Sequence, residues 1–220
     1  MLAKKLLGYA ARNDVIVLGI PRGGVCIAFQ VAAELGAPLD VFVVRKLGVP
    51  CQPELAFGAI ASGGVRILDE QIVEAMEVSA AEIERIAAEE ERELARRERV
   101  YRAARALPKL QGKTVILVDD GIATGSSTRA ALAALRVLQP ARIVLAAPMA
   151  PASACRRLEC EVNELVCLEM PETFRAIGEF YEDFSQVADE EVNALLRLNS
   201  EQCGHEIGSA PAGICKSVYP

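Results

Sequence analysis

Short runs of apolar residues alternate with amphipathic stretches along most of this chain. Such runs are typical of strands that are buried on both faces of a sheet. They predict strands at Val15–Ile20, Leu39–Val44, Val115–Val118, Ile143–Ala147 and Glu164–Leu168. Because helical patterns separate these strands, the expected fold class is α/β, a doubly wound and mainly parallel sheet.

The stretches between the strands have helical periodicity and clear helix ends. After the break at Pro21, Val25–Leu35 has a helical pattern, and Gly36 suits the position just past the last turn. Further helices are predicted at residues 4–11, 129–138, 151–158 and 188–198. The first strand, its helix and the second strand then form a βαβ unit with parallel strands.

One region interrupts this alternation. Leu47–Pro53 contains a glycine and two prolines and predicts a loop, and Glu54–Ala61 and Val65–Leu68 predict a hairpin or a pair of short strands. Residues 69–107 predict one or two helices, the second long and amphipathic, with a capping box at Ser79–Glu82. Their many Glu and Arg residues are more typical of a solvated face than of a binding surface.

Three strand ends carry unusual chemistry. They are Pro21–Gly24, Arg45–Lys46, and the pair Asp119–Asp120, which small residues and hydroxyls follow as far as Ser127. Ligands of open parallel sheets bind beyond the carboxyl ends of the strands, so these three ends converge if the strands are neighbours. Helix N-termini attract phosphate, and carboxylates accept hydrogen bonds from sugar hydroxyls. The pattern therefore indicates a site for a phosphorylated sugar.

Two common nucleotide motifs do not fit these loops. A dinucleotide fingerprint needs Gly-x-Gly-x-x-Gly, whereas the chain has Gly19 followed by Gly23-Gly24, and a P-loop needs a lysine that Gly125-Ser126-Ser127 lacks. Taken singly, the acidic pair could be a helix-flanking turn, the glycine pair a tight connection, and the basic pair a solvated strand end.

Composition narrows the class of protein. The chain has 220 residues, 52% of them hydrophobic and 5% aromatic, with a net charge of −6. The negative charge argues against nucleic acid as a partner, and no apolar run approaches the roughly 20 residues of a membrane span. Seven irregularly spaced cysteines favour reduced thiols in a soluble, cytoplasmic protein and give little support for a zinc site. The lone His205 has no chemistry beside it.

Val115–Ser127 resembles the phosphoribosyl-pyrophosphate (PRPP) motif of the type I phosphoribosyltransferases: apolar residues, an acidic pair, two mostly apolar positions, then Ala-Thr-Gly-Ser-Ser. Gly121 departs from the motif, where an aliphatic residue is usual, and we interpret it as added backbone freedom. Residues 1 to about 198 resemble a bacterial branch of predicted phosphoribosyltransferases. That branch shares Pro-Arg-Gly-Gly, Val-Arg-Lys-Leu-Gly, Pro-Glu-Leu-Ala-x-Gly-Ala and a C-terminal Phe-Tyr-x-x-Phe.

The resemblance implies a pentosyltransferase of nucleotide metabolism that transfers the 5-phosphoribosyl group of PRPP to a nitrogen acceptor and releases pyrophosphate. Asp119 and Asp120 would accept hydrogen bonds from the ribose hydroxyls, and Asp120 is a candidate general base. Backbone N–H groups and hydroxyls at the following helix N-terminus would hold the 5′-phosphate. The residues implied are Ala123, Thr124, Gly125, Ser126 and Ser127.

The same resemblance assigns the pyrophosphate end of the site. Arg22, Gly23 and Gly24 would bind pyrophosphate, at a peptide that is often strained or cis in this family. Arg45 and Lys46 would neutralise pyrophosphate as it leaves. Mg²⁺ is the implied cofactor, held mainly by substrate oxygens and water and not by a dedicated carboxylate cage.

The acceptor should enter beneath a hood, which varies within this superfamily. Candidates for the hood are residues 69–107 and 171–184, in which Phe174, Tyr181 and Phe184 could stack on a base or only pack. The chain starts close to its first strand, so an N-terminal hood element is expected to be missing or truncated. Family resemblance and the amphipathic insertion predict a homodimer.

The expected organisation has five parts. Residues 1–68 form the first part of the core with a flexible loop at 46–65, and residues 69–108 form a helical insertion that is a hood or dimer element. Residues 109–170 complete the core and contain the PRPP loop. Residues 171–198 are hood-like, and residues 199–220 form a disordered tail.

Two other functions remain open at this stage. The chain could be a regulator that senses PRPP or a nucleotide without turnover, or a sugar-phosphate hydrolase or phosphorylase on a similar sheet. Arg45 and Lys46 favour the transferase, whereas the lack of an obvious base pocket favours the sensor. The acceptor is not identified by any residue pattern.

Overall fold

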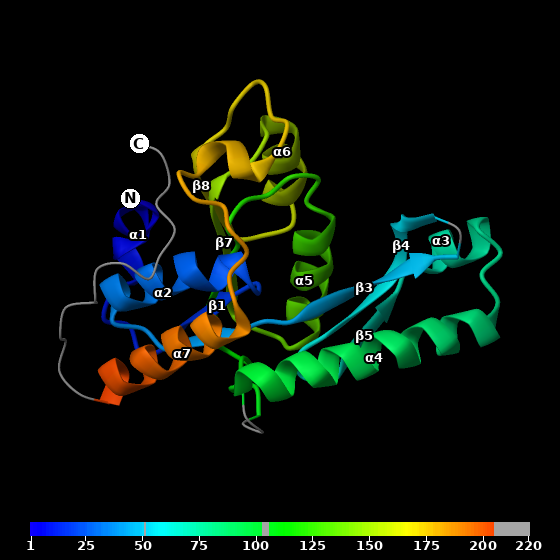
Figure 1. Ribbon diagram of the computed structural model, residues 1–220, viewed down its shortest axis with the longest axis horizontal. Helices are drawn as coiled ribbons and strands as arrows, with labels where there is room; N and C mark the ends of the chain where they lie inside the picture. Colours follow the sequence, from blue (N-terminus) through cyan, green and yellow to red (C-terminus); the bar gives the residue numbers. More distant parts are fainter. Residues whose placement is uncertain (51, 103–105, 205–220) are drawn as a thin grey trace. The chain divides into compact units, whose positions relative to one another are not determined.

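The computed structural model describes residues 1–50, 52–102 and 106–204 (Figure 1). The chain divides into two compact units. Unit 1 comprises Met1–Val41, Pro108–Gly125 and the chain from Gln139 onward, and unit 2 comprises Phe42–Leu107 and Ser126–Leu138. The predicted disorder of residues 205–220, and His205 with it, lies outside the described residues.

Unit 1 contains a five-stranded parallel sheet in the order β2-β1-β6-β7-β8. Its strands are β1 (Val15–Gly19), β2 (Leu39–Val41), β6 (Thr114–Val118), β7 (Arg142–Met149) and β8 (Glu164–Glu169). The apolar run of β6 is fully buried, as expected for a central strand covered on both faces. The predicted parallel α/β fold is confirmed.

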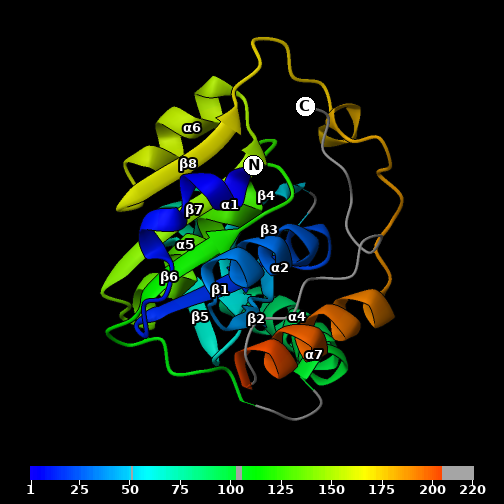
Figure 2. The same cartoon turned by 90° about the vertical axis from the view of Figure 1, so that its left-hand side faces the viewer.

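The helices of unit 1 occupy the stretches between and after these strands. They are α1 (Leu2–Lys5), η1 (Leu7–Tyr9), α2 (Gly23–Leu35), α6 (Ala152–Glu159), η2 (Ile177–Phe180) and α7 (Asp189–Gly204). Helix α2 packs on β1 and lies beside α7 in both views (Figures 1 and 2). It ends as predicted at Gly36, which has a φ of 61°. A long connection with one 3₁₀ turn leads from β8 to α7 (Figure 2).

The predicted tail begins too early. Helix α7 continues from Asp189 to Gly204, so the expectation that the chain loses structure after Asn199 is wrong for the described part of it. The physical reason is Asn199, whose side chain is buried against the start of β2. Its Oδ1 accepts from the Leu39 N–H at 2.8 Å, and its Nδ2 donates to the Ala37 carbonyl at 3.2 Å.

Unit 2 contains a three-stranded antiparallel sheet in the order β3-β4-β5. Its elements are β3 (Val44–Val49), β4 (Gln52–Ala61), β5 (Val65–Leu68), α3 (Glu70–Ala75), α4 (Ala80–Arg102) and α5 (Ser126–Val137). Helix α5 packs against all three strands, and α4 packs along β3 and β4. The predicted hairpin of β4 and β5 is confirmed.

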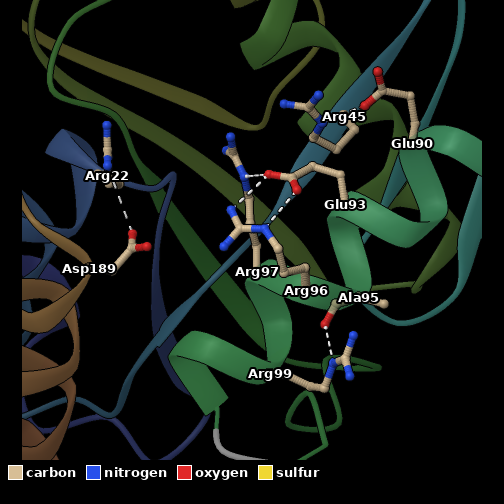
Figure 3. Close-up of polar contacts among 9 residues, drawn as sticks. All are labelled: Arg22, Arg45, Glu90, Glu93, Ala95, Arg96, Arg97, Arg99 and Asp189. Atoms are coloured by element: carbon tan, nitrogen blue, oxygen red, sulfur yellow. Dashed lines mark hydrogen bonds and ion pairs between the residues drawn. The ribbon is translucent and has the colours of Figure 1, made fainter.

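Helix α4 confirms the predicted capping box and solvated face. The Ser79 hydroxyl accepts from the Glu82 N–H, and the Glu82 carboxylate accepts from the Ser79 N–H at 3.0 Å. Further along the helix, Glu93 binds both Arg96 and Arg97 at 2.8 Å (Figure 3). Hydrogen bonds from these two arginines lower the pKa of Glu93 to about 2. The charges of α4 therefore largely satisfy one another.

A strand prediction and a loop prediction near residue 45 are wrong. The apolar run Leu39–Val44 is not one strand, because β2 ends at Val41 and β3 begins at Val44 in the other sheet. The predicted loop Leu47–Pro53 is mostly strand, and the register between β3 and β4 shifts on either side of Gly48. A bulge admits a glycine without ending the strand. Residues 46–65, expected as a flexible loop, thus form most of β3 and β4.

No helix in the described parts of the chain is both long enough and apolar enough to cross a membrane.

Candidate functional site

Strands β1 and β6 are neighbours, so the loops that follow them leave the same edge of the sheet. Gly19 of β1 pairs with Val118 of β6, and the Ile20 N–H donates to the Val118 carbonyl at 2.9 Å. The loop Pro21–Gly24 and the pair Asp119–Asp120 therefore start side by side. The predicted convergence of these two strand ends is confirmed.

The two loops approach each other at their glycines. A Cβ added to Gly23 would lie 1.8 Å from Oδ2 of Asp120, and one added to Gly24 would lie 2.8 Å from the Val118 carbonyl oxygen. Contacts this short exclude any side chain without rearrangement. The Pro21–Arg22 peptide is cis. Gly23 and Gly24 thus let the backbone at the start of α2 lie directly against the acidic pair.

Hydrogen bonds fix the backbone of the acidic turn. The Asp119 N–H donates to the Ala146 carbonyl at 3.2 Å, and the Ile122 N–H donates to the Met149 carbonyl at 3.0 Å, so strand β7 supports the turn on both sides. Oδ1 of Asp119 accepts from the Asp120 N–H at 3.0 Å. Both carboxylates are partly exposed. The arrangement presents two adjacent carboxylates on a braced turn.

The small-residue loop continues this turn. Ala123 and Thr124 are exposed, and the Thr124 carbonyl accepts from Nη2 of Arg157 in α6 at 3.3 Å. Gly125 has a φ of 79°, a conformation that favours glycine, and packs near Leu158. Ser126 and Ser127 come next along the chain, as the first two residues of α5 in unit 2. The first N–H groups of a helix have no acceptor within the helix, which suits anion binding.

Arg22 stands at the N-cap position of α2, directly before Gly23. Its Nη1 lies 4.0 Å from Oδ1 of Asp189, at the start of α7 (Figure 3). Its side chain is about one-third exposed. A guanidinium at this position can bind a phosphate group at the edge of the sheet.

Arg45 and Lys46 do not occupy the predicted end of a parallel strand. They lie in β3 of unit 2, where Nε of Arg45 binds Oε2 of Glu90 in α4 at 2.6 Å (Figure 3). The expectation that this pair ends β2 is wrong, because β2 stops at Val41. Arg45 therefore links β3 to α4 within unit 2.

Comparisons with known proteins identify the family of this chain. A family model described as "Phosphoribosyl transferase domain" matches residues 52–185, more than half of the chain. The crystal structure of TT1426 from Thermus thermophilus has 41% sequence identity and a TM-score of 0.80, covering 89% of this chain and 92% of that chain. The chain belongs to the type I phosphoribosyltransferase family.

Longer relatives of this family member exist. "Putative phosphoribosyl transferase Rv0571c" of Mycobacterium tuberculosis H37Rv is 46% identical over 195 residues, which are 89% of this chain. A protein of M. tuberculosis CDC 1551, "Putative phosphoribosyl transferase MT0597", gives the same values. The aligned region is 44% of the length of each, so the chain spans less than half of these curated relatives.

The aromatic residues predicted for a phosphoribosyl acceptor take part in packing. Phe174 stacks on Phe180 with ring centroids 5.6 Å apart, and Tyr181 is buried with its ring 5.2 Å from that of Phe184. Burial, then the negative charges of Asp120 and Asp119, raise the pKa of Tyr181. Phe184 is 43% exposed, more than the buried Tyr181. In this structure Phe174 and Tyr181 pack against other rings, which is the alternative that the sequence left open.

Sequence reasoning missed several side chains that, within the described residues, contact the predicted site residues. They include Asp189 beside Arg22, Glu90 beside Arg45, Arg157 beside the Thr124 carbonyl, and Ile177 beside Gly121. Only Ile177 had a signal in the sequence, because Gly121 departs from the family motif. The interpretation of Gly121 as added backbone freedom is wrong. Gly121 has no positive φ, and a Cβ there would lie 2.6 Å from Cγ2 of Ile177.

Proposed function

We propose that this chain transfers the 5-phosphoribosyl group of PRPP to a nitrogen acceptor and releases pyrophosphate. The observation that carries the proposal is the approach of Gly23 to Asp120, where a Cβ would lie 1.8 Å from the carboxylate. It sets the predicted pyrophosphate loop against the predicted ribose carboxylates, at the edge where ligands of such sheets bind. Family membership supports a glycosyltransferase of this type.

The proposed chemistry needs positioned charge more than a protein nucleophile. Breaking the bond between C1 and pyrophosphate builds an oxocarbenium-like sugar and a highly charged leaving group. We assign Asp119 and Asp120 to the ribose hydroxyls, and Arg22 with the N–H groups of Gly23 and Gly24 to pyrophosphate. An acceptor nitrogen attacks C1, and Asp120 is the candidate base for its proton. Arg45 and Lys46 remain proposed partners of the leaving group.

The 5′-phosphate end of the site follows from the loop after the acidic pair. We assign to it the N–H groups and hydroxyls that continue into α5, because a helix N-terminus attracts phosphate. The residues are Ala123, Thr124, Gly125, Ser126 and Ser127. The positive φ of Gly125 supports this assignment, since it turns the chain directly into the helix.

Mg²⁺ is the cofactor that family membership implies. The described residues contain no group of three or more His, Cys, Asp or Glu side chains arranged to hold a metal ion. Mg²⁺ commonly keeps several waters and binds substrate phosphates, so we expect the oxygens of PRPP and water to hold it, next to the carboxylates of Asp119 and Asp120. When bound with PRPP it would neutralise the pyrophosphate. We expect a homodimer, in which α4 is a candidate contact surface.

Calorimetric titration with PRPP and MgCl₂ tests the site. We expect saturable binding, which the double variant Asp119→Asn plus Asp120→Asn weakens at least tenfold, on the order of 1.4 kcal/mol. Asn keeps the shape of each side chain and removes its charge. Equal binding by the double variant would contradict the assignment of the acidic pair.

A PRPP or nucleotide sensor on the same fold is the second candidate. It is favoured by the packing of Phe174 and Tyr181, which occupies two of the three aromatic rings predicted for a base. Pyrophosphate release, measured with PRPP and a panel of nucleobases, separates the two. Pyrophosphate release that depends on the presence of one base identifies a transferase. Binding of PRPP with no pyrophosphate release in the presence of any base supports the sensor.

A further inference from the structure

The segment of residues 171–184, called the C-terminal segment below, is held to the acidic turn by a hydrogen bond. The Tyr181 hydroxyl donates to the backbone carbonyl of Asp120 at 2.5 Å. Tyr181 is only 5% exposed, so this bond is shielded from water. It fixes the peptide between Asp120 and Gly121, which directly follows the carboxylate proposed as general base.

A second contact lies one residue further along. Gly121 leaves room for Ile177, whose Cγ2 would be 2.6 Å from a Cβ at that position. The aliphatic residue that is usual there in the family would collide with Ile177. The glycine and the isoleucine are therefore complementary in shape, and together they bring the C-terminal segment onto the turn.

The C-terminal segment is itself well packed. Phe174, Ile177 and Phe180 pack against the buried core that includes Tyr181, Val118 and Ala146. Phe184 lies against Gly178, with a ring carbon 2.9 Å from the position of a Cβ there. The support on which the acidic turn rests is thus continuous with the core of unit 1.

We propose that Tyr181 and Ile177 are positioning residues: they set the orientation of the Asp119–Gly121 turn toward the ribose of PRPP. This proposal rests on the proposed function for its ligand, but the contacts concern the turn itself. Three supports then hold the turn, namely β7 through Ala146 and Met149, the glycine loop through Gly23, and the C-terminal segment. A turn with one support fewer would populate orientations that do not match the ribose hydroxyls.

Tyr181→Phe in the full chain is the first test, because it removes the hydroxyl and keeps the ring. We expect PRPP affinity, measured with MgCl₂, to fall about fivefold, equivalent to about 1 kcal/mol. Tyr9→Phe is the matched control, because Tyr9 is also buried and also donates a hydrogen bond of 2.5 Å, to Glu164. It should lower thermal stability and leave PRPP affinity unchanged, which separates positioning from general destabilisation.

A double-mutant cycle tests the shape match. Gly121→Ala should weaken PRPP binding, and adding Ile177→Ala should recover at least half of the loss, because the shorter side chain makes room for the new Cβ. Strictly additive losses would contradict the match between Gly121 and Ile177.

Amide hydrogen exchange of the ligand-free chain provides a readout that does not need PRPP. We expect faster exchange in Tyr181→Phe at the Ile122 amide, which donates to Met149, and no change there in Tyr9→Phe. If the unaltered chain fails to bind PRPP, the proposed function fails, and exchange alone decides whether Tyr181 orders the turn. Unchanged exchange together with unchanged affinity in Tyr181→Phe overturns the proposal.

Discussion

At the amino ends of its strands, the parallel sheet carries charged side chains that bind one another, whereas at the carboxyl ends its acidic pair lies against glycine backbone. At the amino end, Arg142 of β7 and Glu164 of β8 interact at 3.1 Å, and Tyr9 bonds to both. At the carboxyl end, the backbone of Gly23 lies so close to Asp120 that an added Cβ would be 1.8 Å from Oδ2. Charge at a strand end therefore does not by itself mark a site. Close backbone approach to a carboxylate is the more informative feature.

Gly23→Ala is the strongest test of the close backbone approach at the carboxyl end. The added Cβ would lie 1.8 Å from Oδ2 of Asp120, so the carboxylate or the loop must move. We expect PRPP affinity to fall more than tenfold and stability to fall by about 1–3 kcal/mol from overpacking. Calorimetric titration and denaturant unfolding measure the two effects.

Gly8→Ala is the control for this substitution, because no atom lies within 4 Å of a Cβ there. It should alter neither quantity by a measurable amount. Binding by Gly23→Ala at the affinity of the unaltered chain would mean that the site tolerates a wider separation of the two loops.

The amino end should respond in stability alone. Glu164→Gln removes the charge that accepts from both Tyr9 and Arg142. We expect a loss of about 1 kcal/mol, since the carboxylate is 37% exposed and water partly replaces its partners. Denaturant unfolding measures the loss, and a parallel drop in PRPP affinity would show that the two ends are not independent.

The two tyrosines should differ in their response to alkaline pH. Burial raises the pKa of both Tyr9 and Tyr181, and the charges of Asp120 and Asp119 raise that of Tyr181 further. The unfolded chain loses these protons near pH 10, whereas the folded chain keeps them, so stability is full below pH 10 and falls as the pH rises.

For Tyr181 the stability should fall as the pH rises above about 10, because the unfolded chain loses this proton there and the folded protein keeps it. The free energy of unfolding, measured between pH 9 and 11, should therefore depend less on pH in Tyr181→Phe than in Tyr9→Phe. Equal slopes would contradict the expected difference between the two tyrosines, in which burial and the charges of Asp120 and Asp119 together hold the proton of Tyr181.

Local pattern was sufficient to predict most of the parallel sheet. The buried run Val115–Val118, the helix end at Gly36 and the capping box at Ser79 each depend on residues a few positions apart, and all three are present in the structure. The same holds for the order of loops at the carboxyl edge, because neighbouring parallel strands end on the same side.

Features that depend on distant partners were not predictable in this way. The run Leu39–Val44 is apolar except for Asp40, although the chain passes from one sheet to the other within it. Phe42 and Val43, which lie between the two strands, are buried and so look like strand residues in the sequence. The continuation of α7 depends on Asn199, whose partners Ala37 and Leu39 lie about 160 positions earlier. The hydropathy pattern alone does not predict such long-range contacts.

Gly121 shows the same limit at the candidate site. Its departure from the family motif was visible in the sequence, but the physical reason, Ile177, lies in a segment with no regular pattern. A glycine that admits a neighbour and a glycine that adopts a positive φ look identical in a sequence. Only the structure separates Gly121 from Gly125.

The hydrogen bond from Tyr181 to Asp120 spans 61 positions, and this has a consequence for the order of events during synthesis. A growing chain exposes its N-terminal part first, so the whole PRPP-like motif leaves the ribosome well before the tyrosine that supports it. A chain that is cut or stalled before residue 181 contains every residue of the motif without this bond. The acidic turn can therefore acquire its final form only after synthesis has passed residue 181.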